Sequence, residues 1–92
     1  MIYYLLKTDL EKAIYNNPSE AVKLLNQFSI VNNNNQLFKA LTLAIILDKV
    51  EIFQQIHPKL LRVTNDQNQT LNHFIASIKS NRGNILKTIN KR

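Results

Sequence analysis

The longest apolar run of the chain lies near its middle, at residues 41–47 (LTLAIIL). Every position of this run except Thr42 is apolar, and a helix that is apolar on all sides is normally buried among its neighbours. The polar pair Asp48–Lys49 interrupts the pattern, after which apolar residues recur at helical spacing from Val50 to Ile56. The pattern predicts two short antiparallel helices joined by a tight turn, with 41–47 as the most buried helix.

Capping signals mark where several helices are expected to begin. Asp48 precedes the second apolar run and Glu51 follows at the spacing of a capping box, so Asp48 is the expected N-cap there. Thr8 and Glu11 have the same spacing near the start of the chain. The pair Asn17–Pro18 predicts that another helix begins at Pro18, with Asn17 as its N-cap. Proline suits the first position of a helix, because the backbone N–H that it lacks would have no partner there.

Polar segments separate the predicted helices. Asn32–Asn35 is a run of asparagines, and this composition predicts a turn or loop. His57–Pro58 ends the central pair, because a residue before proline avoids the helical region. Thr64–Gln69 is a predicted polar turn, and the third pair that follows it is broken at Ser80–Asn84, around the only glycine.

The predicted pairs repeat along the chain. Ala13–Val22 and Ala44–Phe53 share the pattern A-I-x-x-[N/D]-x-x-E-apolar-apolar, at an offset of 31 residues. A period in the low thirties with two short helices per period is typical of a helical repeat array. The sequence therefore predicts one all-α domain over residues 1–92, built from three units at about 1–33, 34–64 and 65–92.

The repeat pattern resembles that of the ankyrin-repeat family. Thr8–Glu11 and Thr70–His73 are similar to its T-P-L-H opening, and the two aligned segments above are similar to its middle section. Asn17 and Asp48 stand where the family has turn glycines. The resemblance implies a short ankyrin-like helical-hairpin solenoid that binds proteins, with His73 as a structural histidine. A generic helical-hairpin solenoid is the alternative fold.

Composition narrows the class of protein. The 92 residues include no cysteine, so a disulfide scaffold and a thiolate metal site are excluded. No apolar stretch reaches the roughly 18–20 residues of a membrane span, and the first residues lack the basic region and cleavage site of a signal peptide. We expect a cytoplasmic (intracellular) protein without membrane partners, or one delivered into another cell without a classical signal peptide.

The net charge of +6 is concentrated in the C-terminal part. Up to Glu51, five basic and five acidic residues balance, whereas seven basic residues face Asp66 alone beyond it. This asymmetry indicates an acidic protein partner or a nucleic acid, with a solvated, soluble chain end as the alternative.

Few residues suit catalysis. His57 and His73 lack the H-E-x-x-H spacing of a zinc site, and one glycine cannot make a phosphate-binding loop. We therefore expect no catalytic residue, metal, cofactor or small-molecule substrate. The sequence predicts a non-enzymatic protein-binding module, acting as an inhibitor, adaptor or effector on a larger protein. The alternative is a nucleic-acid-binding protein that uses its basic C-terminal half.

The resemblance also implies where a partner would bind. The outward positions of the first helix in units two and three carry several apolar side chains, and exposed groups of that kind usually mark contacts. Burial of some of them against neighbouring helices is the alternative. Basic residues are expected at the rim, where they would steer an acidic partner. The expected partner-binding residues are Leu43, Ile46, Leu47, Phe74, Ser77 and Ile78, with Arg62, Lys79 and Arg82 at the rim.

Overall fold

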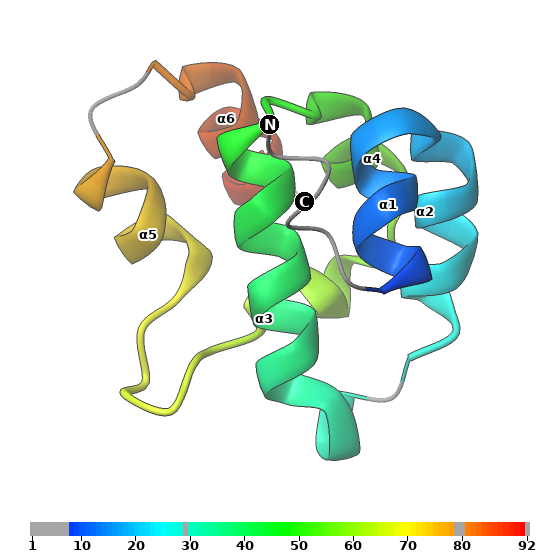
Figure 1. The fold of residues 1–92 in the computed structure, drawn as a ribbon. Coiled ribbons are helices and arrows are strands. Elements are labelled where there is room, and N and C mark those ends of the chain that lie inside the picture. The colour runs from blue at the N-terminus through cyan, green and yellow to red at the C-terminus, as the bar shows by residue number, and fades with distance from the viewer. Residues whose placement is uncertain (1–7, 29, 79–80, 92) are drawn as a thin grey trace.

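The computed structural model describes residues 8–28, 30–78 and 81–91, with the backbone alone for 30–33. Within these ranges the chain is helical, and its only strand-like pairing is a single antiparallel bridge between Thr64 and Thr70. The all-α prediction is confirmed. The elements are α1 (Asp9–Asn16), α2 (Pro18–Asn26), α3 (Ile30–Ile46), α4 (Val50–Gln55), the 3-10 helix η2 (Pro58–Arg62), α5 (Leu71–Ser77) and α6 (Gly83–Lys91) (Figure 1).

The helices form two rows. One row is α1, α3 and α5, in which each helix packs on the next, and the other is α2, α4 and α6. The rows are joined where α1 packs on α2 and α3 on α4. Figure 1 shows α3 in the centre, with α5 on one side and α1 on the other. These contacts establish a compact helical molecule, but they do not confirm an ankyrin-like solenoid with hairpin-shaped turns.

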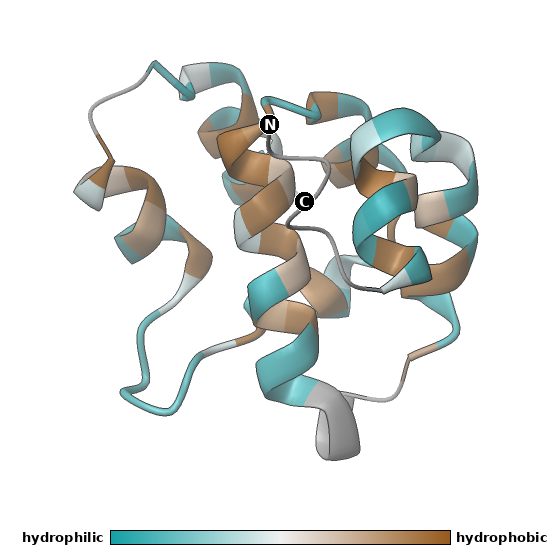
Figure 2. Ribbon diagram, viewed as in Figure 1, coloured by the Kyte–Doolittle hydropathy of each residue, from teal (hydrophilic) through white to brown (hydrophobic). Residues whose placement is uncertain are grey.

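Burial along α3 differs from the prediction in part. Leu41, Ala44 and Ile45 are fully buried, as expected for the central helix. Ile46, however, is 48% exposed, and Leu43 is only partly buried. Helices α1, α4 and α5 pack on α3, and the side chain of Ile46 in its last turn stays half exposed. Figure 2 shows that the coloured part of α3 is most hydrophobic toward its C-terminal end.

The run Asn32–Asn35 was predicted as a loop, and this prediction is wrong. It lies inside α3, which begins at Ile30. Asparagine has a low helix propensity, because its side chain competes for backbone hydrogen bonds. Here the side chain of Asn34 bonds elsewhere: its Nδ2 donates to the carbonyl oxygen of Thr64, and its Oδ1 accepts from the Thr64 N–H at 3.3 Å. A tertiary contact therefore uses both halves of the amide.

The turn after α3 also differs from the prediction. Asp48 is not an N-cap: it has a φ of 58° and closes the C-terminus of α3 in the left-handed region, which Asp and Asn tolerate better than most residues. Its N–H donates to the Ile45 carbonyl at 3.0 Å, and the Lys49 N–H donates to that of Ala44 at 2.9 Å. This pair of bonds is a Schellman motif. Lys49 takes the N-cap position of α4 without a side-chain hydrogen bond.

The other predicted caps are confirmed. The side chain of Thr8 accepts the N–H of Glu11 at the start of α1, and that of Asn17 accepts the N–H of Glu20 at the start of α2. The polar turn before α5 is held by Asn65, whose Oδ1 accepts two backbone N–H groups. No helix in the described ranges is both long enough and apolar enough to cross a membrane.

Candidate functional site

Most of the residues expected to bind a partner lie on α3 and α5 or directly after their C-terminal ends. Ile46 is the one large hydrophobic residue that is exposed among those described. Leu43, Leu47, Phe74 and Ile78 are half-buried and pack against the core. We call these five residues and the exposed Ser77 the α3–α5 surface. The two helices contact each other, so the structure brings the sequence-predicted apolar residues onto neighbouring elements.

Arg82 binds the end of α3. Its Nε donates to the Ile45 carbonyl at 2.7 Å, and its second guanidinium nitrogen donates to the Ile46 carbonyl at 2.9 Å. Nε also lies 3.9 Å from a carboxylate oxygen of Asp48. The last carbonyls of a helix lack intrahelical partners and carry the negative end of its dipole, so a guanidinium is well suited to them. Arg82 thus holds the segment before α6 against α3, beside Ile46.

The remaining predicted rim residues are dispersed. Arg62 is exposed at the end of η2, and Lys79 lies outside the described residues. Other exposed basic side chains of the C-terminal half are Lys59, Lys87 and Lys91. The positive charge is therefore spread over η2 and α6, and Arg82 is engaged in hydrogen bonds. Sequence reasoning missed the hydrogen bonds of Arg82, because α3 and the segment before α6 are neighbours only in the folded chain.

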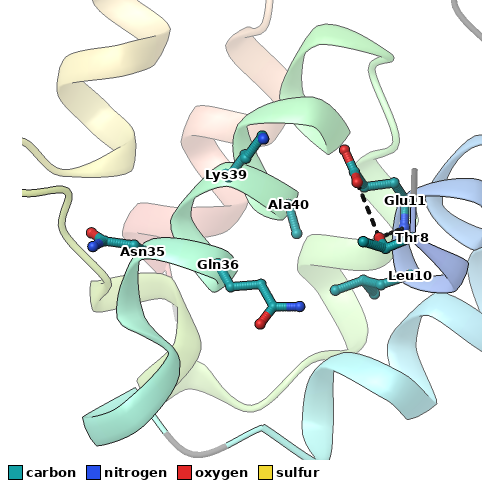
Figure 3. A pocket seen from close by; sticks show the side chains of 7 residues that line it. All are labelled: Thr8, Leu10, Glu11, Asn35, Gln36, Lys39 and Ala40. Atoms are coloured by element: carbon teal, nitrogen blue, oxygen red, sulfur yellow. Dashed lines mark hydrogen bonds between the residues drawn. The ribbon is translucent and has the colours of Figure 1, made fainter. Parts of the chain in front are cut away.

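A cavity of about 280 Å³ lies between the start of α1 and the first half of α3. Figure 3 shows Gln36 and Ala40 of α3 pointing toward Leu10 and Thr8. Leu10 and Ala40 are buried and give the cavity an apolar floor. Its lining residues are Thr8, Leu10, Glu11, Asn35, Gln36, Lys39 and Ala40.

The polar groups around this cavity are of mixed character. The hydroxyl of Thr8 donates to the Glu11 carboxylate at 3.1 Å (Figure 3), while Lys39 supplies a cation and Asn35 and Gln36 supply amides. Such a rim can pair with both the N–H and the C=O groups of a peptide. Sequence reasoning assigned Thr8 and Glu11 to capping alone, because the packing of α1 on α3 has no local signal in the sequence.

The two histidines occupy separate places. His73 lies in the first turn of α5, where its Nδ1 accepts the N–H of Thr70 at 3.0 Å and completes a capping box. This supports the structural role that was predicted for His73. The hydrogen-bond partner of its ring is Thr70, the N-cap of the same helix. His57 is exposed before Pro58, and its backbone N–H donates to Asn26. Within the described ranges, no three His, Asp or Glu side chains gather closely enough to hold a metal ion.

Comparison with known proteins relates the chain to a family of enzymes. The model of the Reprolysin (M12B) family of zinc metalloproteases matches residues 3–88. No curated protein and no solved structure matches the chain.

The match corrects several expectations from the sequence. The assignment to ankyrin repeats is wrong, because the matching family is a metalloprotease family. The predicted non-enzymatic binding module, its nucleic-acid-binding alternative and the expectation of no enzyme activity are overturned by the same finding. The physical reason for the error is that a period in the low thirties reports only that helix pairs stack. It does not distinguish the families that use such pairs.

The residues of the chain do not fit the zinc that this family implies. Zinc metalloproteases of the H-E-x-x-H type hold the metal with two histidines four positions apart on one helix, and the intervening glutamate is the general base. Here the only histidines, His57 and His73, are sixteen positions apart, and neither is followed by glutamate. Catalytic zinc sites use about three protein ligands, which the described residues do not bring together.

Proposed function

Because the chain belongs to the Reprolysin (M12B) family of zinc metalloproteases, we propose that it takes part in hydrolysing peptide bonds of protein substrates. The observation that carries this proposal is the family match over residues 3–88 of 92. A protein substrate agrees with the sequence-based expectation of a protein partner. The expectation that the chain has no small-molecule substrate conflicts with this function, because a protease also accepts short peptides.

We propose that this chain contributes to substrate binding within such a protease. The metal of these enzymes is the source of activated water, and the residues that the structure describes bring no ligand set together to hold it. The zinc ligands of the proposed protease therefore lie outside these residues. What the chain does offer is an apolar surface and a set of exposed cations.

The α3–α5 surface is the proposed place where the substrate binds. Ile46 is 48% exposed at the end of α3. The half-buried residues Phe74 and Ile78 lie on α5 and at its C-cap, and α5 packs on α3. An exposed aliphatic side chain suits contact with an apolar side chain of an unfolded substrate. Arg82 keeps this surface in shape by fixing the last carbonyls of α3.

The charge of the chain points to acidic substrate segments. Arg62, Lys59, Lys87 and Lys91 are exposed in the C-terminal half, and the only acidic residue beyond Glu51 is Asp66. Exposed charges of one sign raise the rate at which an oppositely charged partner associates, and salt weakens this effect. We therefore propose that the preferred segments combine leucine-like side chains with glutamate or aspartate.

Binding of a labelled peptide tests this proposal. The probe is a fluorescein-labelled peptide of leucines separated by glutamates, and its affinity is measured by fluorescence polarisation at low and high salt. We expect Ile46→Ser to weaken binding by about thirtyfold, equivalent to about 2 kcal/mol, because apolar anchors dominate contact energies. The matched control is Gln36→Ala, which changes the same helix at the α1–α3 cavity and should leave binding unchanged.

Two results would contradict the assignment. If the wild-type chain does not bind the peptide at low salt, the surface is not a substrate site. If Gln36→Ala weakens binding and Ile46→Ser does not, the cavity between α1 and α3 binds the substrate instead. Unfolding of Ile46→Ser is a small risk, because this side chain is half exposed whereas its neighbour Ile45 is fully buried.

A further inference from the structure

The ring of His73 faces a donor where a zinc ligand would need an acceptor. The Thr70 N–H donates to Nδ1 at 3.0 Å, so Nδ1 carries the lone pair and the ring proton is on Nε2. A histidine that binds zinc through Nε2 normally donates its Nδ1–H to a carboxylate or carbonyl. In this chain the same change would point two N–H groups at each other. Zinc binding at His73 therefore costs the capping box of α5.

His57 lacks partners for a metal site. Its side chain is exposed at the start of η2, and the residues on either side of it, Ile56 and Pro58, supply no ligand atom. No group of three potential ligands lies around it in the described part of the chain. One exposed imidazole binds zinc only weakly, because a tight site needs three or four ligands that are held in place.

Three of the six carboxylates already have other roles. Glu11 accepts a hydrogen bond from Thr8, Asp48 lies beside Arg82, and Glu20 stands in the first turn of α2, where negative charge is favourable. In addition, no polar or charged residue in the described ranges is buried. A preformed metal site leaves inward-pointing ligands that need the ion, and no buried side-chain nitrogen or oxygen lacks a partner among these residues.

We infer that this chain folds without zinc and does not hold the catalytic zinc of its family with its own side chains. The inference rests on the same family assignment as the proposed function. It specifies that these residues do not supply the metal-binding part of the metalloprotease chemistry. The hydrophobic core explains how the chain can fold without zinc. It is a continuous apolar cluster that includes Leu25, Leu41, Phe53 and Ile85, and it draws on all six α-helices of the described chain.

Metal titration and thermal unfolding of the 92-residue chain test this inference. The purified chain is treated with EDTA, dialysed and titrated with zinc against a coloured chelator, and its melting temperature is recorded in EDTA and in equimolar zinc. We expect the chelator to retain the zinc and the two melting temperatures to agree. A ligand that binds only the folded state raises the melting temperature, so agreement means that no tight site exists.

Two variants make the result specific. His73→Gln keeps an acceptor at the capping-box position and removes an imidazole, and His57→Gln is the matched change at the exposed histidine. Both should melt and titrate like the wild type. The inference is overturned if the wild type takes up one equivalent of zinc in competition with the chelator, or if EDTA lowers its melting temperature. Either result would leave the proposed role in proteolysis intact and would place a metal site within this chain.

Discussion

At the scale of single residues, local capping was readable from the sequence and long-range hydrogen bonding was not. Thr8 and Asn17 cap their helices as predicted, because an N-cap and its N–H partner lie within one turn. Asp48 was predicted as the N-cap of α4 and instead follows the end of α3 with a positive φ. A short polar side chain suits both an N-cap and a left-handed C-terminal position, so the sequence did not distinguish them. Arg82 gave no signal, since its acceptors are more than thirty residues away.

The contribution of Arg82 can be measured by substitution. Arg82→Met keeps most of the aliphatic length and removes the donors to the carbonyls of Ile45 and Ile46. We expect the free energy of unfolding to fall by about 1–3 kcal/mol, as for loss of charged hydrogen bonds to groups that stay partly buried. Urea unfolding followed by circular dichroism measures this. Lys87→Met is the matched control at an exposed site, and an equal effect of both changes would contradict the role given to Arg82.

At the scale of elements, hydrophobic periodicity predicted six helices, and tertiary contacts set the bounds of one of them. The starts of α5 and α6 lie close to the predicted ones, because apolar spacing and the polar segments around Gly83 define them. Helix α3 is longer than predicted and includes Asn32–Asn35. Composition alone favours a loop there, and the bonds between Asn34 and the distant Thr64 favour the helical position.

Substitution of Asn34 tests whether its hydrogen bonds to Thr64 stabilise the helical conformation of the asparagine run. Asn34→Asp keeps the acceptor for the Thr64 N–H and replaces the donor to the Thr64 carbonyl with a second acceptor. We expect a loss of about 1–2 kcal/mol in unfolding free energy, since the partly buried carbonyl of Thr64 loses its partner. Asn35→Asp, at an exposed position in the same helix, is the control. Hydrogen exchange should show faster opening of the first turns of α3 in Asn34→Asp alone. Unchanged exchange would contradict a stabilising role of the Asn34–Thr64 hydrogen bonds.

At the scale of the whole molecule, the sequence predicted the fold class and not the family. Apolar spacing is enough to specify stacked helix pairs, because burial of one face per helix depends on period and not on residue identity. Family and function depend on specific side chains, and here the motif that defines zinc metalloproteases is absent from the chain. Of the predicted contact residues, Ile46 is exposed and close to Arg82, whereas the basic residues lie on several elements.

The most direct test of the central claim is peptide hydrolysis by the protein in its native form. The protein is isolated from its native source under mild conditions and assayed with fluorescence-quenched peptides that contain leucine and glutamate, with and without a zinc chelator. The recombinant 92-residue chain is assayed in parallel with added zinc. We predict chelator-sensitive hydrolysis in the native isolate and none by the recombinant chain. A native isolate that cleaves no peptide, or cleaves equally well with the chelator, would contradict the proposed role in zinc-dependent proteolysis.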